Sequence, residues 1–301
     1  MQVIEEIKAG YEQEMQELLA DPCIYIVNAG TMNNGKSSLF NSFLGEEVFE
    51  VKDFRTTTVN REYATDIENV YYIDTPGLGA RDEDSEEAYR AYEKAHLILF
   101  VHNLNTGSLT RSEVDELRKI QELYFNPSIF WENLILVFTH KDDCEEDETA
   151  RYENIRAKVL DEITKELGFD GDITTFAVDN LTYMEGIRGN EPILIQDSGI
   201  NELKRHVAIR VGGLQNDLER YKAAQILRTK AKYLEKVKVA IEEQQKAYEE
   251  IKAAAVQEYE PVSRQLRDLR NSLRETTQKM LLLDTKINST RAKIDYLKLT
   301  F

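Results

Sequence analysis

An eight-residue string near the start of the chain most constrains how this sequence can fold. Residues 30–37 read GTMNNGKS, directly after the apolar run Cys23–Asn28 and directly before the helical pattern of Ser37–Leu44. The string fits G-x-x-x-x-G-K-[ST], which needs a strand before it and a helix after it. In that setting the backbone N–H groups of the loop and of the first helical turn face an anion. A chance glycine-rich turn is the alternative, and the context disfavours it.

The region from residue 21 to residue 212 alternates short apolar runs with amphipathic stretches. Helical patterns such as Arg111–Leu123 and Arg151–Leu167 separate runs rich in β-formers. Continuous apolar runs are typical of parallel strands that are buried on both faces. We therefore expect an α/β fold with a mostly parallel sheet flanked by helices. The predicted strands are Cys23–Asn28, Val70–Ile73, Leu97–Val101, Leu134–Thr139 and Ile173–Ala177.

Both ends of the chain are predicted to be helical. Residues 1–20 place apolar side chains at helical spacing, and Asp21-Pro22 would end that helix. After residue 212, two heptad stretches are separated by Pro261, and their similar lengths favour an antiparallel helical hairpin, or coiled coil. A single kinked helix is the alternative. We therefore expect three parts. Residues 1–20 form an N-terminal helix that packs on the arm, residues 21–212 form the α/β domain, and residues 213–301 form the helical arm.

Three residue positions around the glycine-rich loop predict a site for Mg²⁺ and phosphate. Lys36 would reach the β- and γ-phosphates of a nucleotide, and the Ser37 hydroxyl would coordinate Mg²⁺. Asp74 closes the predicted strand Val70–Ile73, so its carboxylate is placed to hold the same ion through water. It opens the string DTPG, in which the Gly77 N–H would meet the γ-phosphate.

A further string, His140-Lys141-Asp142-Asp143, follows the predicted strand Leu134–Thr139. It resembles the guanine-specificity motif N/T-K-x-D. Asp143 would accept hydrogen bonds from guanine N1 and N2, and the Lys141 stem would lie along the base. His140 stands where the motif usually has Asn, which leaves open how the base-binding loop is linked to the phosphate loop. Taken alone, the string is better explained as a solvated charge run, but its order after the other two motifs disfavours that alternative.

With these motifs in order, residues 22–212 resemble P-loop GTPases of the translation-factor-related class. The Era-like, septin-like, immunity-associated and dynamin-like groups match best, because Leu78 follows D-x-x-G where many other members have Gln. The resemblance implies GTP or GDP and Mg²⁺ as ligands and hydrolysis of GTP. It also implies nucleotide contacts for further residues and a switch threonine that joins Mg²⁺. These are Asn33, Asn34, Gly35 and Ser38 in the loop, Thr57 or Thr58 as the switch threonine, and Ala177 at the base.

The resemblance also bears on activation. Leu78 has no polar atom to orient the attacking water, so a second GTPase domain is expected to complete the site in a homodimer or homo-oligomer. Asn33 would allow K⁺ to bind beside the phosphates. The other hypothesis is a nucleotide-gated interaction module with little turnover, whose coiled-coil arm binds a partner protein.

Charge and hydropathy limit the remaining partners. The formal net charge of −17 argues against nucleic acid as a partner. The apolar runs are far shorter than the ~20 residues that span a membrane, and the N-terminus has no signal-peptide pattern, so we expect a cytoplasmic protein. Residues 261–301 carry nine basic and four acidic groups, a net charge of +5. Peripheral contact with an anionic membrane is therefore an open alternative to a solvated coiled-coil face.

Overall fold

The computed structural model describes residues 2–49, 60–76, 82–124, 126–141 and 148–300. Its contacts divide the chain into two compact units. One unit is Glu5–Tyr233, and the other combines Met1–Ile4 with Leu234–Phe301.

A six-stranded sheet lies at the centre of the unit Glu5–Tyr233. Its strands, in spatial order, are β2 (Arg61–Ala64), β3 (Val70–Asp74), β1 (Ile24–Ala29), β4 (Leu97–Asn103), β5 (Leu134–Thr139) and β6 (Thr174–Ala177). The edge strand β2 is antiparallel to β3, and the other four pairings are parallel. The predicted α/β fold with a mostly parallel sheet is thus confirmed. Strand β2 was not predicted, because its four residues, REYA, are mostly exposed and show no apolar run.

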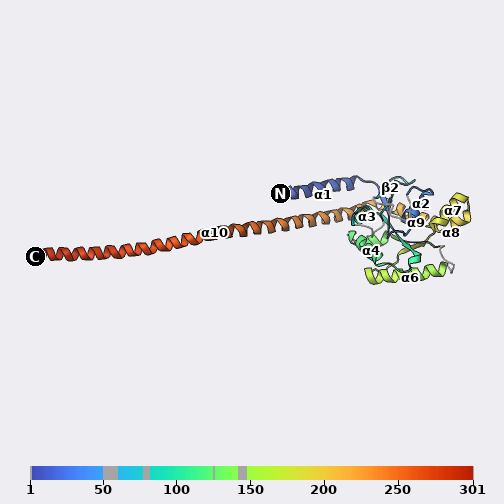
Figure 1. Cartoon of the computed structure of the whole chain (residues 1–301). Coiled ribbons are helices and arrows are strands. Elements are labelled where there is room, and N and C mark those ends of the chain that lie inside the picture. The colour runs from blue at the N-terminus through green and yellow to red at the C-terminus, as the bar shows by residue number, and fades with distance from the viewer. Residues whose placement is uncertain (1, 50–59, 77–81, 125, 142–147, 301) are drawn as a thin grey trace. The chain divides into compact units, whose positions relative to one another are not determined.

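Helices cover both faces of this sheet (Figure 1). One apolar cluster joins a face of the sheet to α3 (Asp82–Lys94), α4 (Arg111–Leu123), α5 (Pro127–Glu132) and α6 (Glu148–Leu167). The other cluster joins the opposite face to α2 (Lys36–Leu44), α7 (Asn180–Gly189) and α9 (Ile200–Asn216). The short elements η1 (Leu104–Thr106) and α8 (Pro192–Asp197) also belong to this unit.

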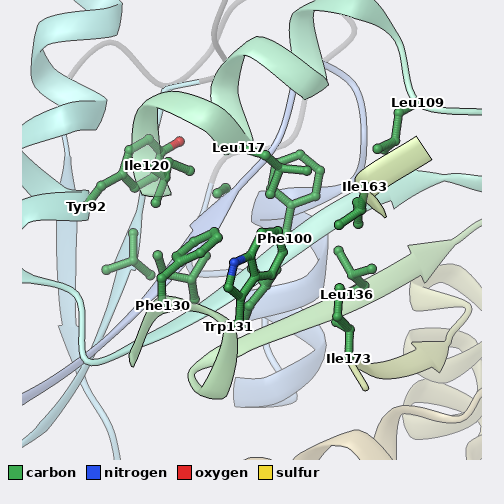
Figure 2. Packing of buried hydrophobic residues seen from close by; sticks show 14 of the residues in the cluster. Tyr92, Phe100, Leu109, Leu117, Ile120, Phe130, Trp131, Leu136, Ile163 and Ile173 are labelled. Atoms are coloured by element: carbon green, nitrogen blue, oxygen red, sulfur yellow. The ribbon is translucent and has the colours of Figure 1, made fainter. Parts of the chain in front are cut away.

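The larger core cluster contains the single tryptophan of the chain (Figure 2). Trp131 is 4% exposed and stacks on Phe169, with ring centroids 4.4 Å apart and an interplanar angle of 9°. Phe130 packs edge-on against it at 4.7 Å. Burying one such aromatic side chain stabilises a fold by about 1.5–3 kcal/mol. Because Trp131 is buried in this core, its fluorescence reports unfolding of this unit and not of the distal arm, residues 234–301.

The predicted N-terminal helix is present as α1 (Gln2–Ala20). Within the unit Glu5–Tyr233, it packs along the first residues of α10 (Leu218–Thr300). Tyr11 contacts Tyr233 edge-on at 5.4 Å, and Lys232 forms an ion pair with Glu14 at 3.2 Å. After the helix, Asp21 accepts a hydrogen bond from the Cys23 N–H at 2.9 Å, which turns the chain into β1.

The predicted hairpin in the arm is wrong, because α10 is one continuous helix with Pro261 inside it. A hairpin between two helices needs a short loop of turn residues, and Glu258–Val262 supplies none apart from the proline. The apolar stripe also continues across the proline, because Ala255, Tyr259, Val262 and Leu266 follow one another in steps of four, three and four residues. That spacing keeps one helical face apolar without a reversal of the chain.

In the described ranges, no helix has an apolar stretch that is long enough to cross a lipid bilayer.

Candidate functional site

The loop between β1 and α2 has the left-handed backbone that its glycines predict. Gly30 has φ +130°, and a Cβ there would lie 2.4 Å from the Val101 carbonyl oxygen, so a side chain would displace β4. Asn33 has φ +66°, and Gly35 has φ +84° immediately before α2 begins at Lys36. The first N–H groups of α2 lack partners within the helix, and they lie at the end of this loop. The geometry suits an anion at the N-terminus of α2.

Lys36 lies inside the loop rather than on the surface. Its side chain is buried, and Nζ donates a hydrogen bond to the Thr31 carbonyl oxygen at 2.9 Å. Burial lowers the pKa of Lys36, and the negative charges of Glu116 and Asp74 act in the opposite direction. Among the described residues, the acceptor of this buried ammonium is a backbone carbonyl, so Lys36 is available to a stronger, anionic acceptor.

The predicted Mg²⁺ ligands from α2 and β3 are brought together. The Ser37 hydroxyl donates to Asp74 Oδ2 at 2.8 Å, and Asn28 Nδ2 donates to Asp74 Oδ1 at 2.6 Å. Hydroxyl and carboxylate oxygens are the ligands that Mg²⁺ prefers, so these residues fit that ion. Within the described ranges, no group of three or more His, Cys, Asp or Glu residues could hold a metal ion.

Thr139, the residue before His140, links the loop that begins with the predicted guanine motif to the phosphate loop. The Thr139 hydroxyl donates to the Asn34 carbonyl oxygen at 2.9 Å. His140 has φ +61°, and its Nδ1 lies 3.0 Å from the same hydroxyl. Thr139 thus connects the two loops, although His140 stands where the motif usually has Asn. This role of Thr139 was not predicted from the sequence.

A pocket of about 390 Å³ opens beside this link. It extends from the N-terminal turn of α2 to the start of α7. Asn180 Nδ2 donates to the Gly35 carbonyl oxygen at 3.3 Å, and the Asp179 carboxylate caps α7 through the Thr182 N–H. The lining residues are Gly35, Ser38, Asn41, Glu47, His140, Asp179, Asn180, Leu181, Met184 and Arg188.

Two predicted base-side residues lie next to this pocket without lining it. Lys141 Nζ donates to the Asp197 carbonyl oxygen at 2.6 Å. Ala177 ends β6, and its carbonyl oxygen would lie 2.4 Å from a Cβ at Gly199. Asp179 and Asn180, two and three residues beyond Ala177, line the pocket instead.

Four predicted site residues lie outside the described part of the chain. They are Thr57, Thr58, Gly77 and Asp143, and Leu78 lies outside it as well. Their roles in Mg²⁺ binding, γ-phosphate binding, catalysis and guanine recognition stay predictions. Asn33 is described and exposed, and its proposed role toward K⁺ also stays a prediction.

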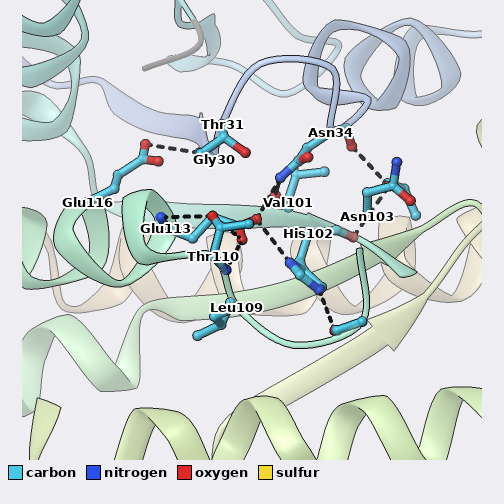
Figure 3. Close-up of polar contacts among 12 residues, drawn as sticks. Gly30, Thr31, Asn34, Val101, His102, Asn103, Leu109, Thr110, Glu113 and Glu116 are labelled. Carbon is cyan, nitrogen blue, oxygen red and sulfur yellow. Dashed lines mark hydrogen bonds and ion pairs between the residues drawn. The ribbon is translucent and has the colours of Figure 1, made fainter. Parts of the chain in front are cut away.

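A buried polar network beneath the loop was not foreseen (Figure 3). Asn34 Nδ2 donates to the Val101 carbonyl oxygen at 2.9 Å and to Glu113 Oε1 at 2.8 Å. Glu116 Oε1 accepts the Gly30 N–H at 3.0 Å. The string Thr110-x-x-Glu113 is readable in the sequence as a capping box, and the structure contains that box at the start of α4. The sequence does not reveal that the two α4 carboxylates are buried.

Comparisons with known proteins identify the domain that carries this site. Residues 24–173 match the model of the AIG1 family. An uncharacterized protein of Acinetobacter baylyi is 29% identical over 193 residues, which cover 63% of this chain and 42% of that protein. Immune-associated nucleotide-binding protein 10 of Arabidopsis thaliana is 30% identical over 166 residues, which cover 51% of this chain and 35% of that protein. The chain thus spans less than half the length of these curated relatives.

One solved structure resembles nearly the whole chain. It is described as an oligomerised bacterial dynamin pair that provides a mechanism for long-range sensing and tethering of membranes. The match has a TM-score of 0.51 and 14% identity, and it covers 93% of this chain and 51% of that chain. At this identity the likeness concerns the fold alone.

Proposed function

Residues 24–173 are a P-loop GTPase domain of the AIG1 type, and from this premise we propose that the chain binds GTP with Mg²⁺ and hydrolyses it to GDP and phosphate. The observation that carries the proposal is the joint placement of Lys36, Ser37 and Asp74 around the N-terminus of α2. One buried cation, one hydroxyl and one carboxylate at that point match the needs of a Mg²⁺–triphosphate.

Each of these residues has a separate task in the proposed site. Lys36 would exchange the Thr31 carbonyl for oxygens of the β- and γ-phosphates, which are stronger acceptors because they are charged. Ser37 and Asp74 would hold Mg²⁺, which would supply positive charge beside the β-phosphate of the leaving GDP. Asn28 keeps the Asp74 carboxylate oriented through its 2.6 Å hydrogen bond.

Guanine selectivity in this proposal depends on Asp143 and on Lys141, of which Lys141 lies next to the pocket at the start of α7. A carboxylate that receives two donors from guanine is left unpaired by adenine, and an unpaired buried acceptor is costly. Thr139 and Asn180 join that region to the phosphate loop through Asn34 and Gly35. Recognition of the base and of the phosphates is therefore supported by one connected set of hydrogen bonds.

We further propose that two GTPase domains pair during hydrolysis. Phosphoryl transfer depends on positioning and on electrostatic stabilisation, and Leu78 has no polar atom for either. A pairing domain would complete the site, and K⁺ held by Asn33 would add a fixed positive charge. The likeness to the fold of a bacterial dynamin pair supports this part, as does the oligomerised state that its description names.

The test is GTP turnover per molecule as a function of protein concentration. We expect slow turnover at nanomolar protein, a rise toward tens of micromolar, and stimulation by K⁺ over Na⁺ that Asn33→Ala removes. A rate per molecule that stays flat over this range in K⁺ buffer would refute activation by pairing. Equal affinity for ATP and GTP would refute the guanine assignment.

A nucleotide-gated interaction module with little turnover is the second candidate. The exposed apolar stripe of the distal arm favours it, because Leu266, Leu269 and Leu273 are each at least 63% exposed. A partner protein on this stripe would account for that exposure. The basic charge of the same segment would also suit an anionic membrane, so the test includes vesicles. Sedimentation with a candidate partner, or with anionic vesicles, in GTP and in GDP distinguishes this function from turnover. A cytoplasmic location goes with either candidate.

A further inference from the structure

Two buried carboxylates lie beneath the phosphate loop, on consecutive turns of α4 (Figure 3). Glu113 and Glu116 are each 1% exposed. A phosphate-binding loop gains affinity from positive charge, so buried negative charge at its base opposes its ligand. The two carboxylates differ in their hydrogen bonds, and that difference decides what each one does when an anion arrives.

Glu113 has donors on both of its oxygens. Oε1 accepts from Asn34 Nδ2 at 2.8 Å and lies 2.9 Å from His102 Nδ1, while Oε2 accepts from the Thr110 N–H and hydroxyl, both at 2.8 Å. Burial alone would raise the pKa of Glu113, but the hydrogen bonds from His102 and Thr110 outweigh burial and hold the pKa below its usual value. Glu113 is a fixed anion that positions Asn34.

Glu116 is stabilised on one oxygen. Oε1 accepts from the Tyr92 hydroxyl at 2.6 Å and from the Gly30 N–H at 3.0 Å. Among the described residues, none forms a hydrogen bond with Oε2, although this atom is buried. Burial raises the pKa of Glu116, and Tyr92, Lys36 and the Gly30 N–H only partly offset it. A buried carboxylate with one free oxygen can accept a proton there without breaking a contact.

The charged and titratable groups around Glu116 come from four elements. Lys36 on α2 is the cation, Tyr92 on α3 is the hydroxyl donor, and Glu113 on α4 adds negative charge. Asp74 on β3 acts on the same Lys36. In the described residues, one buried lysine thus faces three carboxylates before any nucleotide is present. A triphosphate that pairs with Lys36 offsets the positive charge that favours ionised Glu116.

We propose that Glu116 takes up a proton when the triphosphate binds, so that this residue sets the pH dependence of nucleotide affinity. The step is simple in its balance: a proton from solvent bonds to Oε2, and Oε1 keeps both of its donors. The inference rests on the proposed binding of guanine nucleotide to this loop. It makes Glu116 a positioning residue, because it acts on phosphate through the Gly30 backbone and through Lys36.

Calorimetry of Mg-GTP binding to the full chain tests this, in buffers of different ionisation enthalpy between pH 6 and pH 9. We expect the wild-type chain to take up a fraction of a proton when it binds Mg-GTP, and its affinity to fall with rising pH by at most tenfold per pH unit in that range. Glu116→Gln should lack the part of the uptake that Glu116 supplies, so its profile should be flatter and its affinity roughly tenfold higher at pH 8. The amide keeps an oxygen for Tyr92 and Gly30, so no hydrogen bond is lost. Other groups that titrate in this range, such as the γ-phosphate, are common to both chains and cancel in the comparison.

Three further variants separate this role from a merely structural one. Glu116→Ala should weaken binding, opposite in sign to Glu116→Gln, because the Gly30 N–H loses its acceptor. Glu113→Gln, the matched control one turn away, should also weaken binding, since each of its contacts needs an acceptor. Tyr92→Phe should move the proton uptake to higher pH, because ionised Glu116 loses its strongest donor.

The outcomes are decisive in each direction. Equal proton uptake in the wild-type chain and in Glu116→Gln would overturn the inference, as would weaker binding by Glu116→Gln at pH 8. Either result leaves nucleotide binding itself intact. A wild-type chain that bound no guanine nucleotide would overturn the inference and the proposed function together.

Discussion

Replacing Gly199 by alanine should destabilise the nucleotide-binding unit and also lower its affinity for nucleotide. Gly199 precedes α9 with φ +75°, and a Cβ there would lie 2.4 Å from the Ala177 carbonyl oxygen at the end of β6. Gly168 offers a matched control, because it has φ +69° and its Cβ would meet no atom within 4 Å. Both substitutions force an alanine into a left-handed backbone, but only Gly199→Ala brings its Cβ against a strand, β6.

The magnitude follows from separating these two effects. The left-handed backbone costs an alanine about 1–2 kcal/mol, and both variants carry that cost. A contact a full ångström too short has to be relieved by backbone shifts, which typically cost about 1–3 kcal/mol. We therefore expect a loss of about 2–5 kcal/mol in the free energy of unfolding for Gly199→Ala and about 1–2 kcal/mol for Gly168→Ala.

Urea unfolding followed by Trp131 fluorescence measures this loss for the right unit, because the tryptophan is buried in its core. Nucleotide affinity supplies the second readout. The Ser198 carbonyl accepts the Asp179 N–H at 2.8 Å, and the Asp197 carbonyl accepts Lys141 Nζ, so a shift at Gly199 moves the base side of the pocket. Only Gly199→Ala should lower GTP affinity. Equal losses of stability in the two variants, or unchanged affinity in Gly199→Ala, would show that the close approach of α9 and β6 does not position the site.

The remaining predictions concern charge. Lys36→Ala should lower Mg-GTP affinity at least tenfold in calorimetry, since a charge-assisted contact is worth about 1.5–3 kcal/mol. A urea midpoint of unfolding that is unchanged or higher in the unliganded variant would show that the loss is local. Asp143→Asn should shift preference from GTP toward the xanthine nucleotide in competition binding; an unaltered preference contradicts its role at the base. Burial lowers the pKa of His96 to about 4, below its unfolded value, so the unfolded chain binds the proton first and stability falls as pH drops below about 6.5. We expect a loss of about 2 kcal/mol between pH 7 and pH 5, absent in His96→Asn.

The sheet and the phosphate loop could be predicted because each has a local signature. Continuous apolar runs marked five of the strands, and the spacing of GTMNNGKS to Asp74 marked the Mg²⁺ ligands. Ser37 and Asp74 are 37 residues apart in the chain, yet parallel strands ending at the same edge bring them to 2.8 Å. Strand β2 has neither signature, since it is a short, polar edge strand.

The buried network could not be predicted because it depends on which face of α4 meets the sheet. Glu113 and Glu116 lie on the same stripe as Val114, Leu117 and Ile120, and a sequence alone favours solvent for both carboxylates. Thr139 was missed for a related reason, because the sequence does not show which segment the hydroxyl of the last residue of β5 will contact. The hairpin failed because heptads fix a helical face but do not say whether the chain turns back at a proline.

The change of step beside Pro261 has a geometric consequence for anything that packs along α10. Strict seven-residue spacing, as in Leu234–Ala255 and again in Leu266–Ile287, makes two wrapped helices coil to the left. The eleven residues from Ala255 to Leu266 hold three steps, and an eleven-residue period coils slightly to the right. A companion helix would therefore unwind locally at the proline and rewind beyond it. One with uninterrupted heptads would follow the stripe on one side of Pro261 and drift off it on the other.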